Sequence, residues 1–408
     1  MQPTIIELEE RYCAHNYAPL SLVLTRGAGC YVWDDAGNRY LDMLSAYSAV
    51  SFGHAHPRLL KVLNEQAARL AVVSRAFHSD RLAPFVKRAC ELTGMDLGLP
   101  MNTGAEAVET ALKAARKWAY TIKGVPADQA EILVCEGNFH GRTITVVGFS
   151  SEPQYREGFG PFPAGFIRIP YGSASALEQA ITQNTAAFLV EPVQGEGGII
   201  VPPSGYLASC AEICRAHKVL LLCDEVQTGL GRTGRILACQ HEAVIPDGLM
   251  LGKALGGGLL PVSMFLAKRE LMEMFRPGDH GSTFGGNPLA AAVGLEALNL
   301  LLEERLPERA AELGDHLLGR LHSIDSPLIR EVRGKGLFIG IEIDPHYLSG
   351  RDLCQALAAQ GILIKETHEN VIRFAPPLVI TRAQLDWAIE RIAQTFTQAT
   401  PLLKALRR

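Results

Sequence analysis

Short apolar runs alternate with longer amphipathic stretches between about residues 50 and 290. The runs are apolar at nearly every position, which is typical of strands in a parallel sheet whose two faces are both covered by helices. The segments between them are long enough for crossover helices. The predicted strands are Ile132–Cys135, Ala187–Val190, Val219–Cys223, Leu249–Leu251 and Pro261–Ala267. The pattern therefore predicts an α/β fold with a large domain built on a mostly parallel central sheet.

The two ends of the chain have a different pattern. Thr4 and Glu7 have the spacing of a capping box that opens a short helix, and Cys30–Asp42 has the pattern of a hairpin. After about residue 290 we predict helices at Pro288–Leu306, Glu308–Ile324, Arg351–Ala359 and Arg382–Gln398, and strands at Leu337–Ile343, Ile362–Ile364 and Val371–Phe374. We therefore expect an N-terminal segment (1–49) associated with the small domain, a large domain (50–290) and a smaller C-terminal α/β domain (291–408).

Composition and charge exclude several classes of partner. The 408 residues carry a formal net charge of −4 with both signs interspersed, so we expect no nucleic-acid or anionic-membrane partner. The N-terminus lacks the pattern of a signal or transit peptide, and the nine scattered cysteines favour reduced thiols in a cytoplasmic protein. Cys210, Cys214 and His217 could share one helical face, but no second ligand pair stands at zinc spacing, so no metal site is predicted.

Polar side chains follow four of the predicted strands. In an open parallel sheet, ligands bind beyond the carboxyl ends of the strands. The residues at these ends are Asn138-Phe139-His140-Gly141-Arg142, Glu191 with Gln194 and Glu196, Asp224 with Glu225 and Gln227, and Lys253 after a glycine. One edge of the sheet is thus predicted to gather carboxylates, a lysine, an arginine and an aromatic ring.

Each of these features alone also has a plain structural explanation. Asp224 could form a buried ion pair with a lysine or arginine, and Lys253 could be a solvated loop lysine. Asn102 or Thr103 can cap an ordinary helix start, although free amides at such a start also bind phosphate. Two nucleotide motifs are weak. The Walker-like 248–254 is one residue short, and the G-x-G-x-x-G of 229–234 begins five residues past its strand, which leaves a nucleotide-dependent oxidoreductase as a remote alternative.

Taken together, these pieces resemble the class III aminotransferases among the fold-type I pyridoxal-phosphate enzymes. The motifs are Met-Asn-Thr-Gly-Ala-Glu-Ala at 101–107, Asn-Phe-His-Gly-Arg-Thr at 138–143, Glu-Pro-Val-Gln-Gly-Glu at 191–196, Asp-Glu-Val-Gln-Thr-Gly at 224–229, Gly-Lys-Ala at 252–254 and Gly-Ser-Thr-Phe-Gly-Gly-Asn-Pro at 281–288. The likeness runs from about residue 10 to about residue 395, and the order and spacing of the motifs make it specific. A non-catalytic relative would lack Lys253, which is present.

The resemblance implies a role for each residue that would hold pyridoxal 5′-phosphate. Lys253 would bind the cofactor covalently and move a proton, and Asp224 would keep the pyridine nitrogen protonated. Gln227 would donate to the ring oxygen, and Phe139 would stack on the ring. The amides of Gly104 and Ala105 would hold the phosphate. Thr283 would reach the phosphate from the other subunit, so a homodimer with shared active sites is implied.

Within this family, the ornithine aminotransferase branch is the most similar, through His15–Pro19, Ser45–Val50 and Val371–Leu378. That likeness implies that Arg142 holds the α-carboxylate of ornithine, that Tyr17 holds the α-amino group and that Tyr47 lines the same pocket. Arg373 would pair with the carboxylate of 2-oxoglutarate.

Glu196 would neutralise Arg373 while ornithine is bound, or it could be a plain structural ion-pair partner. The implied reaction transfers the δ-amino group of ornithine to 2-oxoglutarate, giving glutamate 5-semialdehyde, which cyclises to pyrroline-5-carboxylate, and glutamate. N-acetylornithine or another ω-amino acid is the nearest alternative donor. Ala105 and Val108 depart from the family pattern, which leaves the strictness for ornithine open.

Overall fold

A seven-stranded sheet forms the centre of the computed structural model, which describes residues 3–368 and 370–406. The strand order is β4-β10-β9-β8-β7-β5-β6. The strands are β4 (Leu97–Met101), β5 (Glu131–Cys135), β6 (Phe166–Ile169), β7 (Thr185–Val190), β8 (Leu220–Asp224), β9 (Gly248–Leu251) and β10 (Ser263–Ala267). Every residue of β7, β8, β9 and β10 is buried, as their continuous apolar sequences predict.

The strand directions confirm a mostly parallel sheet and correct one part of the prediction. Strands β6, β5, β7, β8 and β9 run parallel, whereas β10 is antiparallel to both β9 and β4. The segment 252–262 between β9 and β10 is too short for a parallel crossover, which needs a dozen or more residues. The edge strands β4 and β6 were not predicted, because Gly98 and Pro100 in β4 and Arg168 in β6 interrupt the apolar pattern.

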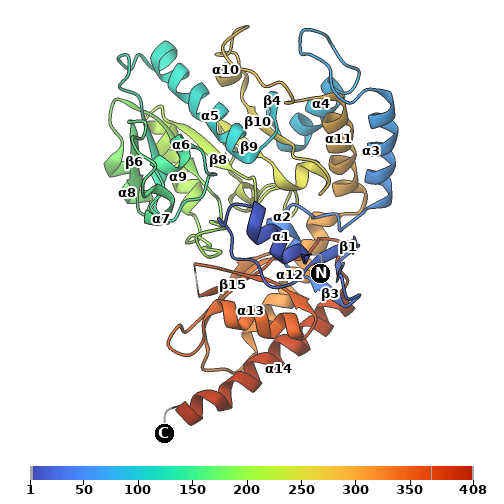
Figure 1. Cartoon of the computed structure of the whole chain (residues 1–408). Coiled ribbons are helices and arrows are strands. Elements are labelled where there is room, and N and C mark those ends of the chain that lie inside the picture. Colours follow the sequence, from blue (N-terminus) through green and yellow to red (C-terminus); the bar gives the residue numbers. More distant parts are fainter. Residues whose placement is uncertain (1–2, 369, 407–408) are drawn as a thin grey trace.

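Helices cover both faces of this sheet (Figure 1). In β5, Leu133 and Cys135 belong to one apolar cluster, whereas Ile132 and Val134 belong to another, so alternate side chains face opposite layers. The helices are α3 (Pro57–Arg69), α4 (Leu82–Thr93), α5 (Gly104–Trp118), α6 (Ile144–Gly148), α7 (Pro153–Arg156), α8 (Ala174–Ala180), α9 (Tyr206–Ala216), α10 (Arg269–Met272) and α11 (Pro288–Glu303). Among the described residues, no helix is both long and apolar enough to cross a membrane.

Two smaller sheets lie at the other end of the molecule (Figure 1). The first has the order β1-β2-β3-β13 and the second β11-β12-β15-β14. The elements are α1 (Ile5–Tyr12), β1 (Leu24–Ala28), β2 (Tyr31–Asp34), β3 (Arg39–Asp42), α2 (Ser45–Ser48), α12 (Leu306–His322), β11 (Ile329–Lys335), β12 (Phe338–Ile343), α13 (Gly350–Ala359), β13 (Ile362–Leu363), β14 (Lys365–Thr367), β15 (Val371–Phe374) and α14 (Arg382–Leu406). The predicted hairpin is confirmed as β2 and β3, and the capping box of Thr4 and Glu7 is present.

Strand β13 differs from the expectation for the C-terminal region. It pairs in parallel with β3, where Ile362 lies opposite Leu41 and Leu363 opposite Asp42. It therefore extends the N-terminal sheet instead of the sheet of β11, β12, β15 and β14. This pairing joins the N-terminal segment to the C-terminal part of the chain. The domain boundaries at 49/50 and 290/291 stay a prediction.

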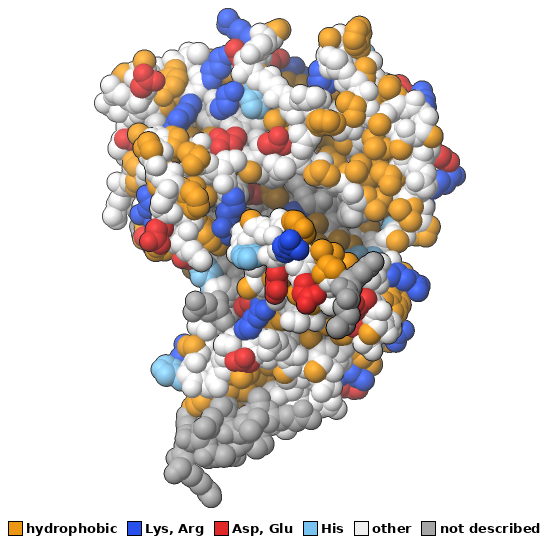
Figure 2. All heavy atoms as spheres, in the orientation of Figure 1, with side chains coloured by type: hydrophobic (Ala, Val, Ile, Leu, Met, Phe, Trp, Pro, Cys, Tyr) orange, Lys and Arg blue, Asp and Glu red, His pale blue; other side chains and the backbone are white. Residues whose placement is uncertain are grey.

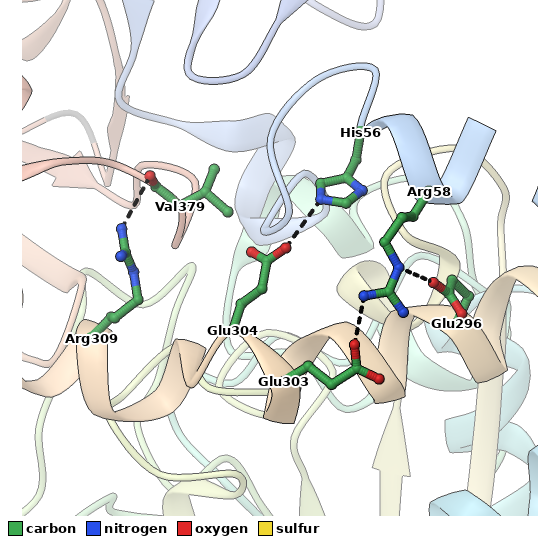
Figure 3. A network of polar contacts seen from close by, with 7 residues as sticks. All are labelled: His56, Arg58, Glu296, Glu303, Glu304, Arg309 and Val379. Atoms are coloured by element: carbon green, nitrogen blue, oxygen red, sulfur yellow. Dashed lines mark hydrogen bonds and ion pairs between the residues drawn. The ribbon is translucent and has the colours of Figure 1, made fainter. Parts of the chain in front are cut away.

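Ion pairs and a hydrogen bond fix α11 and α12 to their neighbours (Figure 3). Arg58 of α3 donates from Nε to Glu296 at 2.7 Å and from Nη1 to Glu303 at 2.5 Å, and both carboxylates belong to α11. Arg309 of α12 donates to the backbone oxygen of Val379 at 3.3 Å, just beyond β15. These contacts align the long helices that connect the large sheet to the smaller ones.

Arg232 is fully buried where the large sheet meets the smaller ones. Its Nη1 donates to the backbone oxygens of Leu337 and Pro376 at 3.0 and 2.6 Å, and its Nη2 donates to the hydroxyls of Ser45 and Ser51 at 3.4 and 3.1 Å. Burial lowers the pKa of this guanidinium to about 9. One side chain thus ties the loop after β8 to the N-terminal segment and to the segments before β12 and after β15.

We predict that Arg232→Leu destabilises the fold strongly. The change removes the donors of four buried acceptors, and each buried acceptor left without a donor costs about 1–3 kcal/mol. We therefore expect a loss of at least about 3 kcal/mol in the free energy of unfolding, seen as a lower thermal midpoint. The matched control is Arg269→Leu, which breaks an exposed i,i+4 pair with Glu273 and should change stability by less than about 0.5 kcal/mol. Equal midpoints for the two variants would contradict the prediction.

Candidate active site

A cavity of about 190 Å³ lies beyond the carboxyl ends of β5, β7, β8 and β9. It is bordered by six residues that the sequence placed in a cofactor site, namely Gly104, Ala105, Phe139, Asp224, Gln227 and Lys253. These residues come from three strand ends and one helix start, so the parallel sheet is what brings them together.

Lys253 is half-buried at the start of the short turn that follows β9. Its φ of +45° lies in the left-handed region, which costs energy for a residue with a side chain and is often retained at functional sites. Desolvation lowers the pKa of the Lys253 amine to about 8, although the carboxylates of Glu196, Asp224 and Glu191 favour the protonated form. A buried amine with a lowered pKa is a far better nucleophile at neutral pH than a solvated lysine.

Asp224 is held by a histidine that the sequence reasoning left without a role. The Asp224 carboxylate contacts Nδ1 of His140 at 2.7 Å and accepts the backbone N–H of Val226 at 3.0 Å. Burial opposes protonation of His140, but the hydrogen bond to Asp224 and the charges of Asp224 and Glu191 outweigh it, so the pKa of His140 is raised. The side chain that pairs with Asp224 is therefore a histidine and not the lysine or arginine that a plain buried ion pair would have used. The signal for His140 was its place in the Asn-Phe-His-Gly-Arg motif.

Glu191 is a second buried carboxylate beside this pair. It accepts the backbone N–H groups of Phe139 at 2.9 Å and Gly195 at 3.1 Å, so it joins the loop after β5 to the loop after β7. Burial raises the pKa of Glu191 to about 7. These two hydrogen bonds fix the backbone of Phe139 at the cavity wall and the backbone of Gly195, the residue directly before Glu196.

The start of α5 offers a site for a phosphate. Thr103 caps the helix and Glu106 completes a capping box, so of the two predicted caps Thr103 is the one used. The first intrahelical bond runs from Ala107 N to Thr103 O, which leaves the amides of Gly104 and Ala105 ahead of it pointing out of the helix. Gly141, with a φ of +124°, lies so close that an added Cβ would be 2.7 Å from the Cβ of Ala105. Backbone at this position can therefore approach the helix start only as glycine.

Glu196 and Arg373 form an ion pair beside Lys253. Nη1 of Arg373 donates to Oε1 of Glu196 at 2.5 Å, and the Arg373 side chain is 1% exposed. Burial opposes ionisation of Glu196, but the charges of Arg373 and Lys253 lower its pKa. The Arg373 guanidinium also lies over the ring of Tyr47, 4.9 Å from its centroid. The structure thus brings together three of the residues proposed to contact substrate.

Tyr47 reaches this position through an unusual backbone. Ser45, Ala46, Tyr47 and Ser48 all have positive φ values between 45° and 73°, so α2 is a short left-handed turn. The turn is fixed at its start, where Asp42 accepts the Ser45 N–H at 2.7 Å. At its Tyr47 carbonyl it accepts a hydrogen bond from Gln227 at 3.3 Å. Sequence patterns do not predict this conformation for residues other than glycine.

Arg142 and Tyr17 do not border the cavity that contains Lys253. The Arg142 guanidinium stacks on the ring of Tyr155 at 3.6 Å from its centroid, and Tyr155 was not selected from the sequence. Tyr17 is 75% exposed and borders, with Tyr47, a separate cavity of about 440 Å³.

Thr283 is the one proposed cofactor residue outside the Lys253 cavity. It is exposed in this chain, and its neighbour Ser282 accepts a hydrogen bond from Asn102 at 2.9 Å. The loop thus lies beside the start of α5, but Thr283 does not border the cavity of its own chain.

The glycine loop that suggested a dinucleotide site has a packing role. Gly231 and Gly234 have positive φ values, and a Cβ on Gly234 would lie 2.9 Å from the Cβ of Ala311 in α12. Arg232 between them is buried in the joint described above. Within the described part of the chain, no cluster of three or more His, Cys, Asp or Glu side chains is arranged to hold a metal ion.

The fold and this site define a class of protein. The chain matches the model of the class III aminotransferase family over residues 12–396, and it belongs to that family. Class III aminotransferases are fold-type I enzymes that use pyridoxal phosphate. The family and the fold class predicted from the sequence are thereby confirmed.

The individual relatives to which the chain is similar are ornithine and acetylornithine aminotransferases. An ornithine aminotransferase from Geobacillus sp. (strain WCH70) is 56% identical over 392 residues, which are 96% of this chain and 98% of the relative. The structure of the ornithine aminotransferase from Toxoplasma gondii, with partial occupancy of pyridoxal phosphate at its active site, has a TM-score of 0.96 and 45% identity, covering 98% of this chain and 95% of that one. An acetylornithine aminotransferase from Elizabethkingia anophelis has a TM-score of 0.88 and 48% identity, covering 96% and 98%.

The residues present fit pyridoxal phosphate. The cavity offers one buried amine to bind an aldehyde, one carboxylate to pair with a protonated ring nitrogen, one aromatic ring to stack and one helix start to bind a phosphate. The buried Nε2 of His140 also has no hydrogen-bond partner among the described residues. Such an orphaned polar atom beside a cavity is expected where a further polar group is bound.

The lowered pKa of Lys253 implies that the free energy of unfolding depends on pH. In the unfolded chain this lysine titrates near 10.5, and in the folded protein near 8. Below pH 8 the folded state therefore holds an unfavourable buried charge, and this penalty disappears as the pH rises from 8 to above 10.

We predict that cofactor-free Lys253→Met is more stable than the cofactor-free parent at pH 7, by on the order of 3 kcal/mol, and that the difference shrinks towards pH 10. Thermal unfolding of both proteins across this pH range measures it. Lys268→Met, which changes an exposed lysine paired with Asp247, is the control and should show no such gain. A parent protein that is the more stable one at pH 7 would sink the prediction.

Proposed function

We propose that this protein transfers the δ-amino group of ornithine to 2-oxoglutarate. The observation that carries the proposal is the ion pair of Glu196 and Arg373 beside Lys253. An amino donor with an uncharged chain next to the reacting carbon needs Arg373 neutralised, whereas a keto acid with a carboxylate there needs Arg373 free. A carboxylate that can pair with the arginine in one half-reaction and release it in the other meets both needs.

The proposed roles at the cofactor come from the resemblance to the family, and the geometry of the cavity supports them. Bound pyridoxal phosphate supplies an electron sink for deprotonation of the carbon that bears the amino group. Lys253 holds the cofactor covalently and, once released, moves the proton. Asp224, kept in place by His140, favours a protonated ring nitrogen. Gly104 and Ala105 bind the phosphate, Phe139 covers one face of the ring and Gln227 donates to its oxygen.

The donor is selected at its far end. Arg142 is proposed to bind the α-carboxylate of ornithine, and the hydroxyl of Tyr17 its α-ammonium group, while Tyr47 lines the space between. This arrangement places the α-carbon away from Lys253 and the δ-amino group towards it. The acetylornithine aminotransferase among the relatives supports N-acetylornithine as the second candidate donor, and an acetylated α-nitrogen carries no charge for Tyr17 to bind.

A substrate panel tests this function. Ornithine, N-acetylornithine, lysine and 4-aminobutyrate are each assayed against 2-oxoglutarate, and we expect the highest kcat/KM for ornithine. A protein that prefers N-acetylornithine would establish the second candidate and overturn the first.

We further predict that Tyr17→Ile lowers kcat/KM for ornithine roughly tenfold or more, since it removes a hydrogen bond to a charged group. The value for N-acetylornithine should change little, and a variant with an unchanged ratio of the two would refute the role of Tyr17.

We also propose that the protein acts as a homodimer in which Thr283 of each chain completes the phosphate site of the other. Two observations support this. Thr283 is exposed and does not border the cavity of its own chain. Large apolar side chains are exposed at α1, in the loop after α3 and next to Thr283, namely Ile5, Ile6, Tyr12, Leu70, Val72, Phe77 and Phe284. Figure 2 shows hydrophobic side chains gathered over the region of α3, α4 and α11.

Sedimentation velocity should show a dimer of 44.2 kDa chains, and a monomer that retains full activity would contradict the shared site. The proposed cytoplasmic localisation would be checked by cell fractionation.

A further inference from the structure

Arg351 ties the segment that carries Tyr17 to the smaller part of the molecule. It lies in the first turn of α13, and its two terminal nitrogens donate to successive backbone oxygens, Nη1 to Ala18 and Nη2 to Pro19 at 2.7 Å. A guanidinium has a rigid planar fork that can span two neighbouring acceptors. The two residues directly after Tyr17 are therefore fixed by one side chain.

The segment has little else to hold it. Residues 13–19 are exposed, and the Tyr17 side chain is 75% exposed. Among the hydrogen bonds of the described chain, those of residues 14–19 are a local contact between His15 and Glu10 and the two to Arg351. Of these, only the two from Arg351 come from the C-terminal part of the chain. Within one chain, they are the hydrogen bonds that join the Tyr17 segment to α13.

Arg351 also lies where the binding spaces meet. It borders the cavity of about 440 Å³ that contains Tyr17 and Tyr47, and the neighbouring cavity of about 780 Å³ that contains Glu196 and Tyr155. Its guanidinium is 32% exposed and lies 4.0 Å from the carboxylate of Glu366 in β14.

We propose that Arg351 is a positioning residue for donor selection, which acts by holding Tyr17 where it meets the α-ammonium group of the donor. This inference rests on the proposed function. Ordering an exposed tyrosine only when the donor binds would reduce affinity for the donor, because the loss of conformational freedom then opposes binding. Arg351 instead orders the segment in advance, so its loss should raise KM for ornithine and leave kcat and KM for 2-oxoglutarate nearly unchanged.

A double-mutant cycle tests this with the full-length holoenzyme. Arg351→Gln should raise KM for ornithine on the order of tenfold, and Arg351→Lys should resemble Arg351→Gln because an ammonium group does not span two carbonyls. In a Tyr17→Phe background, Arg351→Gln should have almost no further effect, since both changes disable one interaction. Arg330→Gln, which breaks a comparable partly exposed pair with Asp344, is the matched control and should leave all constants unchanged.

The outcomes separate the two proposals. An effect of Arg351→Gln that persists in the Tyr17→Phe background, or that falls equally on ornithine and 2-oxoglutarate, overturns the positioning role. The thermal midpoints of both Arg351 variants show whether the changes destabilise the whole fold. The double-mutant cycle still tests the positioning role in that case, because a general loss of stability would have the same effect with Tyr17 as with Tyr17→Phe. A parent enzyme without ornithine activity would refute the proposed function instead.

Discussion

The buried guanidinium of Arg232 is the contact on which the geometry of the site depends. Its hydrogen bonds go to backbone oxygens and serine hydroxyls, which belong to segments far apart in the sequence. One of these acceptors, Pro376, comes shortly after Arg373, and another, Ser45, starts the left-handed turn that carries Tyr47. The segments that carry Arg373 and Tyr47 are therefore joined by a cation that is itself too buried to touch a substrate.

Burial of charge is the common physical cost at this site. Desolvation lowers the pKa of Lys253 to about 8 and raises that of Glu191 to about 7. Other charged groups at the site have specific partners that offset the cost of their burial. His140 contacts Asp224, and Arg373 pairs with Glu196. An amine that is partly neutral near pH 7 is useful to an aminotransferase, and a lysine in a solvated cleft would not provide it.

The pattern of apolar residues was sufficient to predict those strands that are buried on both faces. The strands ending at Cys135, Val190, Asp224 and Leu251 were predicted because they are buried on both sides. Edge strands β4 and β6 were missed because they are only partly covered, so their sequences tolerate glycine, proline and arginine. His140 was missed because its role is a contact with Asp224, 84 residues away, which spacing along the chain does not show.

By itself, the sequence determined the class of fold, the family motifs and the set of polar residues at the strand ends, because periodicity and short spacings are local properties. Only the tertiary structure decided the antiparallel direction of β10, the pairing of β13 with β3, the left-handed turn at Tyr47 and the hydrogen bonds of Arg351 to Ala18 and Pro19. These features depend on contacts between distant segments, and their energies come from packing and desolvation that no local pattern encodes.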